Sequence, residues 1–187
     1  MPLFGAVLTG GASRRMGRTK ALVEVDGTPM ATRVSRALSA AGCESVVLYG
    51  GDPVELARLG QPVLADAHPG QGPLGGILGV LELFADRRAD VLVVACDLAH
   101  LGASDLQLLI AAARERPDAD VIVARGRRLE PACALWRTSS APGVRTAFDT
   151  GERAIHRVFG DLITVEVTLP AASLHNINAP ADLDRYP

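Results

Sequence analysis

Short apolar runs alternate along this chain with segments whose apolar residues recur every three to four positions. The apolar runs predict strands at residues 4–8, 45–49, 62–65, 90–97, 120–124, 131–136 and 163–167. The periodic segments predict helices at 30–41, 54–59, 74–84 and 104–116, and a helix in two pieces over 143–158. We expect Gly42 to end the first of these helices, and a capping box at Ser104 and Gln107 to begin the fourth. This alternation is typical of β-α-β units. We therefore expect an α/β protein with a mostly parallel central sheet and helices on both faces.

The clearest predicted strand, Asp90-Val-Leu-Val-Val-Ala-Cys-Asp97, is apolar without interruption between its two aspartates. Such a run is expected for a strand buried on both faces in the middle of a parallel sheet. Ligands of open α/β sheets gather at the carboxyl ends of the strands, where Asp97 falls. A carboxylate there is a suitable oxygen ligand for Mg²⁺, and the alternative is an ordinary turn residue.

The stretch Leu8-Thr-Gly-Gly-Ala-Ser-Arg-Arg-Met-Gly-Arg-Thr-Lys20 combines glycines with cations directly after the first predicted strand. Gly10 and Gly11 allow backbone N–H groups to approach an anion closely. Four cations suited to a triphosphate follow, namely Arg14, Arg15, Arg18 and Lys20. The spacing matches neither G-x-x-x-x-G-K-[ST] nor G-x-G-x-x-G. A strand-to-helix turn with solvated basic residues remains the alternative interpretation.

Two more glycine-rich turns follow predicted strands. In the first, Gly50 is a candidate contact for a base or ribose, and a simple turn explains it equally well. The second runs from Asp66 to Gly76 and leads into a helix whose glycine-rich N-terminus, around Gly72, offers free N–H groups. Asp66 is either a nucleotide contact or the cap of a turn.

Composition limits the classes of partner. A chain of 187 residues with 48% hydrophobic and 4% aromatic content predicts one domain, residues 1–187, with an aliphatic core. The formal charge of −2 gives no general attraction to nucleic acid, so we expect a small-molecule partner. Three widely spaced cysteines predict neither disulfides nor a zinc site and favour a cytoplasmic location. We expect no membrane span and no exported leader.

The first loop, written L-x-G-G-x-x-x-R-M-G-x-x-K, resembles the opening of the nucleotidyltransferases related to molybdenum cofactor guanylyltransferase. Three later blocks are similar to that family in the same order. They are D-x-x-P-x-x-G-P-L-x-G from Asp66, the C-D pair at Asp97, and N-x-N-x-P-x-D-L from Asn176 to Leu183. The resemblance covers nearly the whole chain.

This resemblance implies a three-layer, Rossmann-like nucleotidyltransferase fold and transfer of GMP from GTP to molybdopterin or its molybdenum form, with release of pyrophosphate. It also implies that Asp97 holds Mg²⁺ and that Lys20, Arg15 and Asp97 are catalytic. Together, the residue patterns and the resemblance give these expected nucleotide contacts: Leu8, Thr9, Gly10, Gly11, Arg14, Lys20, Gly50, Asp66, Gly72 and Asp97. Transient docking to molybdoenzymes or their chaperones is left open.

The chain departs from the family pattern at Thr19, where aspartate is usual, and at Ala99, where proline is usual. Asn178 either caps the last helix or contributes its amide oxygen to the site, and Arg128 and Glu130 border the expected cleft. Three rival functions remain. They are a cytidylyltransferase for the same pterin, a nucleotidyltransferase for another phosphate acceptor, and a nucleotide-binding regulator without turnover.

Overall fold

A computed structural model describes residues 1–10, 19–178 and 182. Its main sheet has the strand order β5-β4-β1-β6-β8-β7-β9. These strands are β1 (Leu3–Leu8), β4 (Ser45–Tyr49), β5 (Val63–Leu64), β6 (Asp90–Ala95), β7 (Val121–Arg125), β8 (Leu129–Arg137) and β9 (Thr164–Thr168). All neighbouring pairs are parallel except the two that involve β8. The mostly parallel sheet expected from the sequence is therefore confirmed.

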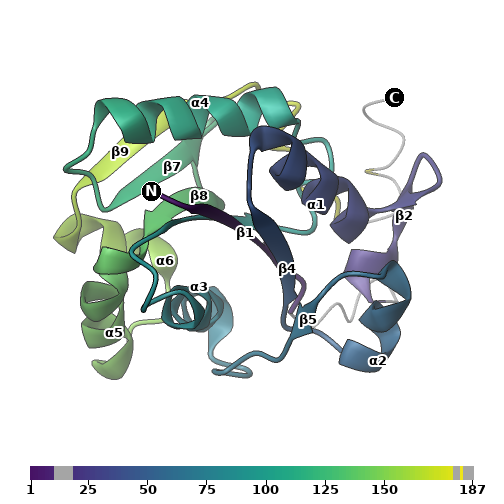
Figure 1. The fold of residues 1–187 in the computed structure, drawn as a ribbon, viewed down its shortest axis with the longest axis horizontal. Helices are drawn as coiled ribbons and strands as arrows, with labels where there is room; N and C mark the ends of the chain where they lie inside the picture. Colours follow the sequence, from purple (N-terminus) through teal and green to yellow (C-terminus); the bar gives the residue numbers. More distant parts are fainter. Residues whose placement is uncertain (11–18, 179–181, 183–187) are drawn as a thin grey trace.

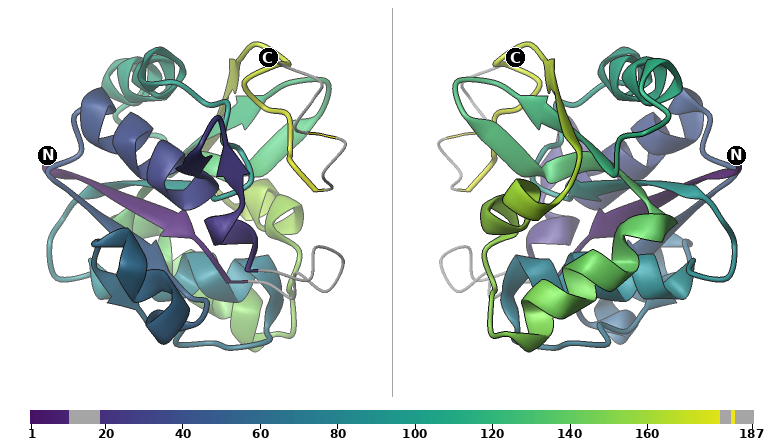
Figure 2. Two further views of the ribbon diagram at one scale, coloured as in Figure 1. Left: turned by 90° about the vertical axis from the view of Figure 1, so that its right-hand side faces the viewer. Right: turned by 90° about the vertical axis from the view of Figure 1, so that its left-hand side faces the viewer.

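Helices cover both faces of this sheet (Figure 1), which confirms the three-layer α/β fold. One face carries α1 and α4, and the other carries α3, α5 and α6; the two edge-on views in Figure 2 show the same separation. The helices are α1 (Met30–Ala41), α2 (Pro53–Leu56), α3 (Gly72–Leu83), α4 (Ala103–Glu115), α5 (Ala141–Asp149) and α6 (Ile155–Val158). Short 3₁₀ turns lie at Lys20–Leu22, Ala57–Leu59, Thr138–Ser140 and Phe159–Asp161. No helix within the described ranges combines the length and apolarity needed to cross a bilayer.

Strand β6 explains why the core has two halves. Its residues Val91 and Val93 pack against the layer of α3, α5 and α6, whereas Leu92 and Val94 pack against the layer of α1 and α4. Successive side chains of a strand point to opposite faces, so a strand covered on both sides must be apolar at every position. The uninterrupted apolar run in the sequence is thus a consequence of burial on both faces.

The ends of two helices test the sequence predictions. Helix α1 ends at Gly42, as predicted, with a left-handed φ of 111° that glycine adopts without strain. Helix α4 was predicted to begin with a capping box at Ser104 and Gln107, and this was wrong. The helix begins at Ala103, and the Gly102 N–H donates to Asp105 Oδ2 at 2.9 Å. The acidic side chain of the first turn thus accepts from the backbone N–H of the N-cap residue, which is Gly102 and not the predicted Ser104.

A small hairpin lies beside the main sheet, formed by β2 (Glu24–Val25) and β3 (Thr28–Pro29). Arg33 of α1 holds it in place, because Nη1 donates to the Val25 carbonyl at 3.2 Å and Nε donates to the Ala99 carbonyl at 3.1 Å. Ala99 is buried with Val25 and Ile177. The residue that replaces the family's proline is therefore a packed core position.

Candidate active site at the carboxyl edge of the sheet

The candidate site lies where β1, β4 and β6 end. These strands are parallel neighbours, with Leu8 opposite both Tyr49 and Ala95. The Cys96 N–H donates to the Leu8 carbonyl at 3.1 Å, which continues the pairing past the end of β6. The segments that follow the three strands therefore leave the sheet at one edge, and they carry Gly10, Gly50 and Asp97.

Lys20, Asp97 and Asn178 form the polar centre of this edge. Lys20 Nζ lies 2.6 Å from Asp97 Oδ2 and 2.7 Å from Asn178 Oδ1. The Lys20 and Asp97 side chains are only 20% and 18% exposed, so their attraction is screened less than that of a surface pair. Residues from the first loop, the central strand and the end of the chain thus meet at one point.

Asn178 joins the end of the chain to the polar centre. Its side-chain oxygen accepts from Lys20, and its backbone N–H donates to Asp182 Oδ2 at 2.8 Å. The neighbouring residue Ile177 is buried, and its N–H donates to the Asp97 carbonyl at 3.0 Å. The segment before Asn178 is therefore fixed directly to the end of β6. The helix expected after Asn178 falls outside the described residues, apart from Asp182.

The second carboxylate oxygen of Asp97 is in a different position. Within the described part of the chain, Oδ1 is buried and has no hydrogen-bond partner. A buried carboxylate oxygen without a donor is costly, and a hard cation would satisfy it. Among the described residues, no group of three or more His, Cys, Asp or Glu side chains could hold a metal. A magnesium ion bound through one carboxylate, water and substrate phosphates fits this set of oxygens.

Glycines form the wall next to this centre. A Cβ added to Gly50, whose φ is 82°, would lie 3.2 Å from the backbone nitrogen of Gly10 and 3.8 Å from Cβ of Asp66. The first loop, the β4 turn and the third predicted loop therefore approach one another closely. Asp66 Oδ1 also accepts from the His68 N–H at 2.9 Å, so the turn-capping contact considered from the sequence is present.

Leu8 and Thr9 contribute to the scaffold of this wall. The Thr9 hydroxyl is buried and donates to the carbonyls of Tyr49 and Gly50, at 3.1 and 2.7 Å, which ties the ends of β1 and β4 together. A Cβ added to Gly76 of α3 would lie 3.6 Å from Leu8 Cδ2. Gly72, at the start of α3, has a φ of 76° and faces Arg153. Its neighbours thus come from the α5–α6 connection.

Several predicted residues cannot be placed. Gly11, Arg14 and Arg15, together with Arg18, lie outside the described residues. Thr19 is the first residue described after them, and its hydroxyl donates to the Glu55 carboxylate of α2. A carboxylate therefore lies beside the position where the family usually has aspartate, although it comes from a different part of the chain. No local pattern indicates Glu55, because its contact with Thr19 spans 36 residues of sequence.

A pocket of about 420 Å³ lies on the Asn178 side of the centre. Its lining combines the turn between β7 and β8 with the segment before Asn178, and consists of Gly126, Arg127, Arg128, Glu130, Ala171, Leu174, His175, Asn176 and Asn178. Asn176 Nδ2 donates to Glu130 Oε2 at 3.2 Å across it. Arg128 and Glu130 therefore do border a cavity, as expected. Burial raises the pKa of the Glu130 carboxyl, and the nearby Asp97 charge adds to this effect.

Two further side chains shape the site without a clear signal in the sequence. The Tyr49 hydroxyl accepts from the Ala67 N–H at 2.9 Å and lies against Gly79 of α3. Burial raises the pKa of this phenol. Cys96, which precedes Asp97, is buried, and burial raises the pKa of its thiol to about 12. Cys96 is therefore a neutral packing residue under the carboxylate and not a nucleophile.

Comparisons with known proteins decide the family. The domain family described as "MobA-like NTP transferase domain" matches residues 5–166. The chain belongs to this family. A molybdenum cofactor guanylyltransferase from Cereibacter sphaeroides is 36% identical over 187 residues, which cover 99% of this chain and 95% of the relative. The Rhodobacter capsulatus protein of the same name is 36% identical over 188 residues, with 99% and 95% of the two chains covered.

Solved structures agree with the family. Molybdopterin-guanine dinucleotide biosynthesis protein A from Archaeoglobus fulgidus superposes with a TM-score of 0.77 at 25% identity, covering 97% of this chain and 95% of that one. A 4-diphosphocytidyl-2C-methyl-D-erythritolsynthase from Anaerococcus prevotii has the same TM-score of 0.77 at 9% identity, covering 99% and 96%. The second likeness concerns the fold alone, which this family therefore shares with proteins of different names.

Proposed function

We propose that this protein transfers GMP from GTP to the phosphate of molybdopterin or its molybdenum form and releases pyrophosphate. The observation that carries the proposal is the meeting of Lys20, Asp97 and Asn178 at the carboxyl edge of the sheet, where Asn178 also lines a pocket. The names of relatives at 36% identity over nearly the full chain support the choice of GTP and of the pterin.

Charge is the main obstacle to this reaction. An acceptor phosphate oxygen attacks the α-phosphorus of GTP and forms a new P–O bond, while the bond to the bridging oxygen breaks and pyrophosphate takes the electron pair. The acceptor is already an anionic nucleophile at neutral pH, so the protein need not supply a general base. It must bring two anions together and stabilise the charge on the leaving group.

The roles of individual residues follow from that requirement. Lys20 is the described cation at the centre, and we assign it to neutralising charge on the triphosphate and on departing pyrophosphate. Backbone N–H groups at Gly10 and Gly11 hold the phosphates, and Arg14 and Arg15 add positive charge. Leu8 and Thr9 hold the strand end that carries these glycines, while Gly50, Asp66 and Gly72 border the nucleoside.

Magnesium suits the oxygen donors at this centre. Asp97 would hold the ion through its unpartnered Oδ1, and the Asn178 amide oxygen is a second donor within reach of the same lysine. When bound, the ion supplies Lewis-acid stabilisation of negative charge on the phosphates.

The pocket beside Asn178 is the proposed acceptor site. Arg127 and Arg128 at its rim are suited to a phosphate, while Glu130 and Asn176 offer hydrogen-bonding groups to a heterocycle. The proposal is supported by Asn178, which lines this pocket and also accepts a hydrogen bond from Lys20. Docking of a molybdoenzyme or its chaperone would then take place over this side of the molecule.

Product analysis tests the proposal. The purified protein is incubated with Mg²⁺, molybdopterin and each of the four nucleoside triphosphates in turn, and the products are identified by mass spectrometry. We expect a guanine dinucleotide and one pyrophosphate per product with GTP only. A cytosine product would show the related cytidylyltransferase instead. Tight GTP binding without pyrophosphate release in the presence of molybdopterin would show a regulator.

A further inference from the structure

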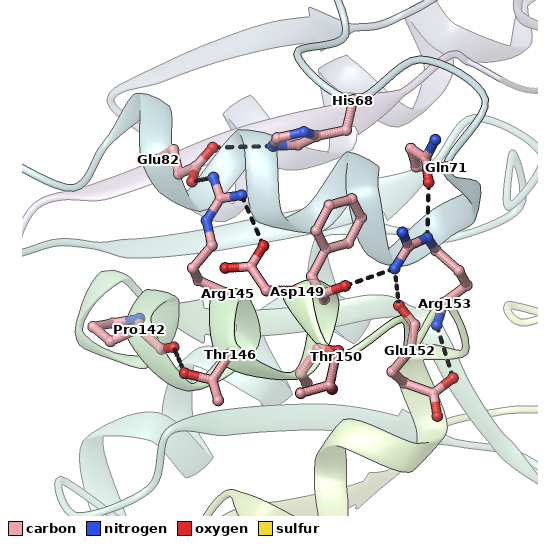
Figure 3. Close-up of polar contacts among 12 residues, drawn as sticks. His68, Gln71, Glu82, Pro142, Arg145, Thr146, Asp149, Thr150, Glu152 and Arg153 are labelled. Carbon is pink, nitrogen blue, oxygen red and sulfur yellow. Dashed lines mark hydrogen bonds and ion pairs between the residues drawn. The ribbon is translucent and has the colours of Figure 1, made fainter.

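The loop between β5 and α3 has one contact with helix α5 and one with the α5–α6 connection. The ring of His68 lies 4.9 Å from the ring of Phe148, and Gln71 Oε1 accepts from Arg153 Nε at 2.9 Å. Figure 3 shows Gln71 and Arg153 pointing toward each other from the two segments. Residues 66–71 therefore contact α5 and the segment after it, in addition to their contact with Tyr49 of β4.

Arg153 is itself fixed by its own segment. Nη1 donates to the carbonyls of Phe148 and Glu152, at 2.7 and 2.6 Å (Figure 3), and the guanidinium carbon lies 4.1 Å from the centre of the Phe148 ring. The Arg153 backbone N–H donates to Glu152 Oε1 at 2.8 Å. A guanidinium held in this way loses little rotamer freedom when it binds Gln71. The Arg153 side chain is thus fixed in one orientation by its hydrogen bonds and by the Phe148 ring.

The opposite side of the same loop borders the glycine wall. Its backbone at Ala67 donates to the Tyr49 hydroxyl, Asp66 lies beside Gly50, and Gly72 has the carbonyl of Arg153 3.8 Å from where a Cβ would stand. The loop is thus placed between the strand ends and α5. A change in the position of Arg153 would be passed through Gln71 and Gly72 to the side that faces the nucleotide.

We propose that Arg153 is a positioning residue for the nucleoside part of the substrate, acting through Gln71 to hold residues 66–72 against the strand ends. This inference rests on the proposed function, which assigns that loop to the nucleoside. The side-chain hydrogen bonds of Arg153 go to Gln71, Phe148 and Glu152, and none within the described residues goes to Lys20 or Asp97. Loss of Arg153 therefore weakens nucleoside binding and leaves the binding of pyrophosphate at the first loop and Lys20 unchanged.

The test measures binding directly, without an acceptor. GTP dissociation constants are determined by equilibrium dialysis for Arg153→Ala, Gln71→Ala, Gln71→Glu and the double Arg153→Ala/Gln71→Ala variant. Arg157→Ala is the matched control, because Arg157 lies four residues further along the chain in α6, is exposed, and forms a side-chain contact with Glu152 alone, at 3.4 Å, among the described residues. Pyrophosphate affinity and thermal unfolding are measured for every variant.

We expect GTP affinity to fall about tenfold in Arg153→Ala and somewhat less in Gln71→Ala, the size expected for losing a charge-assisted hydrogen bond. The double variant should be no weaker than Arg153→Ala, since both changes remove one link. Gln71→Glu keeps an acceptor for the guanidinium and should bind GTP as the wild type does. Arg157→Ala should also match the wild type, and pyrophosphate affinity should not change in any variant.

Other results would overturn the inference. GTP affinity unchanged in Gln71→Ala, which alters an exposed side chain, would remove the proposed link even if Arg153→Ala failed to fold. If GTP affinity, pyrophosphate affinity and thermal stability all fell together, Arg153 would stabilise the fold and would have no specific role in positioning the nucleoside. In both cases wild-type GTP binding leaves the proposed function standing, whereas wild-type protein that binds no nucleoside triphosphate would remove the proposed function itself.

Discussion

Asp97 has two carboxylate oxygens in unlike surroundings, and this difference defines its proposed role. Oδ2 is neutralised by Lys20 at 2.6 Å, whereas Oδ1 is buried without a partner in the described part of the chain. An ion pair with Lys20 alone does not require the second carboxylate oxygen to be buried without a hydrogen-bond partner. The sequence could predict Asp97 as a candidate because a continuous apolar run indicates a central parallel strand, and ligands bind where such strands end.

Replacing Asp97 by alanine should lower Mg²⁺-dependent turnover by on the order of 100-fold or more, as expected for losing the metal's Lewis-acid contribution. The measurement is steady-state pyrophosphate release at saturating GTP and molybdopterin. Asp118→Ala is the control, because Asp118 is an exposed carboxylate paired with Arg116. Nearly normal turnover in Asp97→Ala would exclude Asp97 from the chemistry.

Glu130 gives a prediction that depends on pH. Burial raises its pKa in the folded state, so the folded protein holds the proton more tightly than the unfolded chain does. The stability linked to this proton is complete below the ordinary pKa of glutamate and is lost as the pH rises through the raised value. Glu130→Gln should therefore match the wild type in melting temperature at about pH 4 and exceed it at neutral pH. A constant difference at all pH values would contradict this account.

At the scale of elements, local patterns predicted the strands and helices but not their contacts with one another. Tyr49, Glu55 and Arg153 act across 18, 36 and 82 residues of sequence, respectively, and no periodicity reports such pairings. One signal was present. Gly79 lies inside a helix, where glycine is unfavourable unless another group approaches closely. The close group is the Tyr49 side chain.

Gly79→Ala should destabilise the protein by about 1–3 kcal/mol, the usual cost of inserting a methyl group into a filled space. A Cβ there would overlap the Tyr49 hydroxyl and lie 2.8 Å from Tyr49 Cζ. Chemical denaturation measures the change in unfolding free energy. Gly160→Ala is the matched control, because a Cβ at Gly160 would have no neighbour within 4 Å. Equal effects of the two substitutions would argue against the α3–β4 contact.

At the scale of the molecule, burial on both faces of the sheet provides a natural probe. Trp136 is the only tryptophan in the chain, is fully buried on β8, and pairs with Val91 and Val121 on either side. If residues 1–187 form one cooperative unit, its fluorescence and far-UV circular dichroism should change together during denaturation, with coincident midpoints. Separate midpoints would contradict the single-domain expectation.

The reversed direction of β8 has a consequence for how new specificities can arise in such a molecule. Because β7 and β8 are joined by a short turn and not by a crossover helix, residues 126–128 reach the pocket from a hairpin. A hairpin tip tolerates insertion and replacement far better than the paired strands behind it. If the pocket is the acceptor site, as proposed, evolution can exchange the acceptor through this turn while the glycines and the Lys20–Asp97 pair stay as they are.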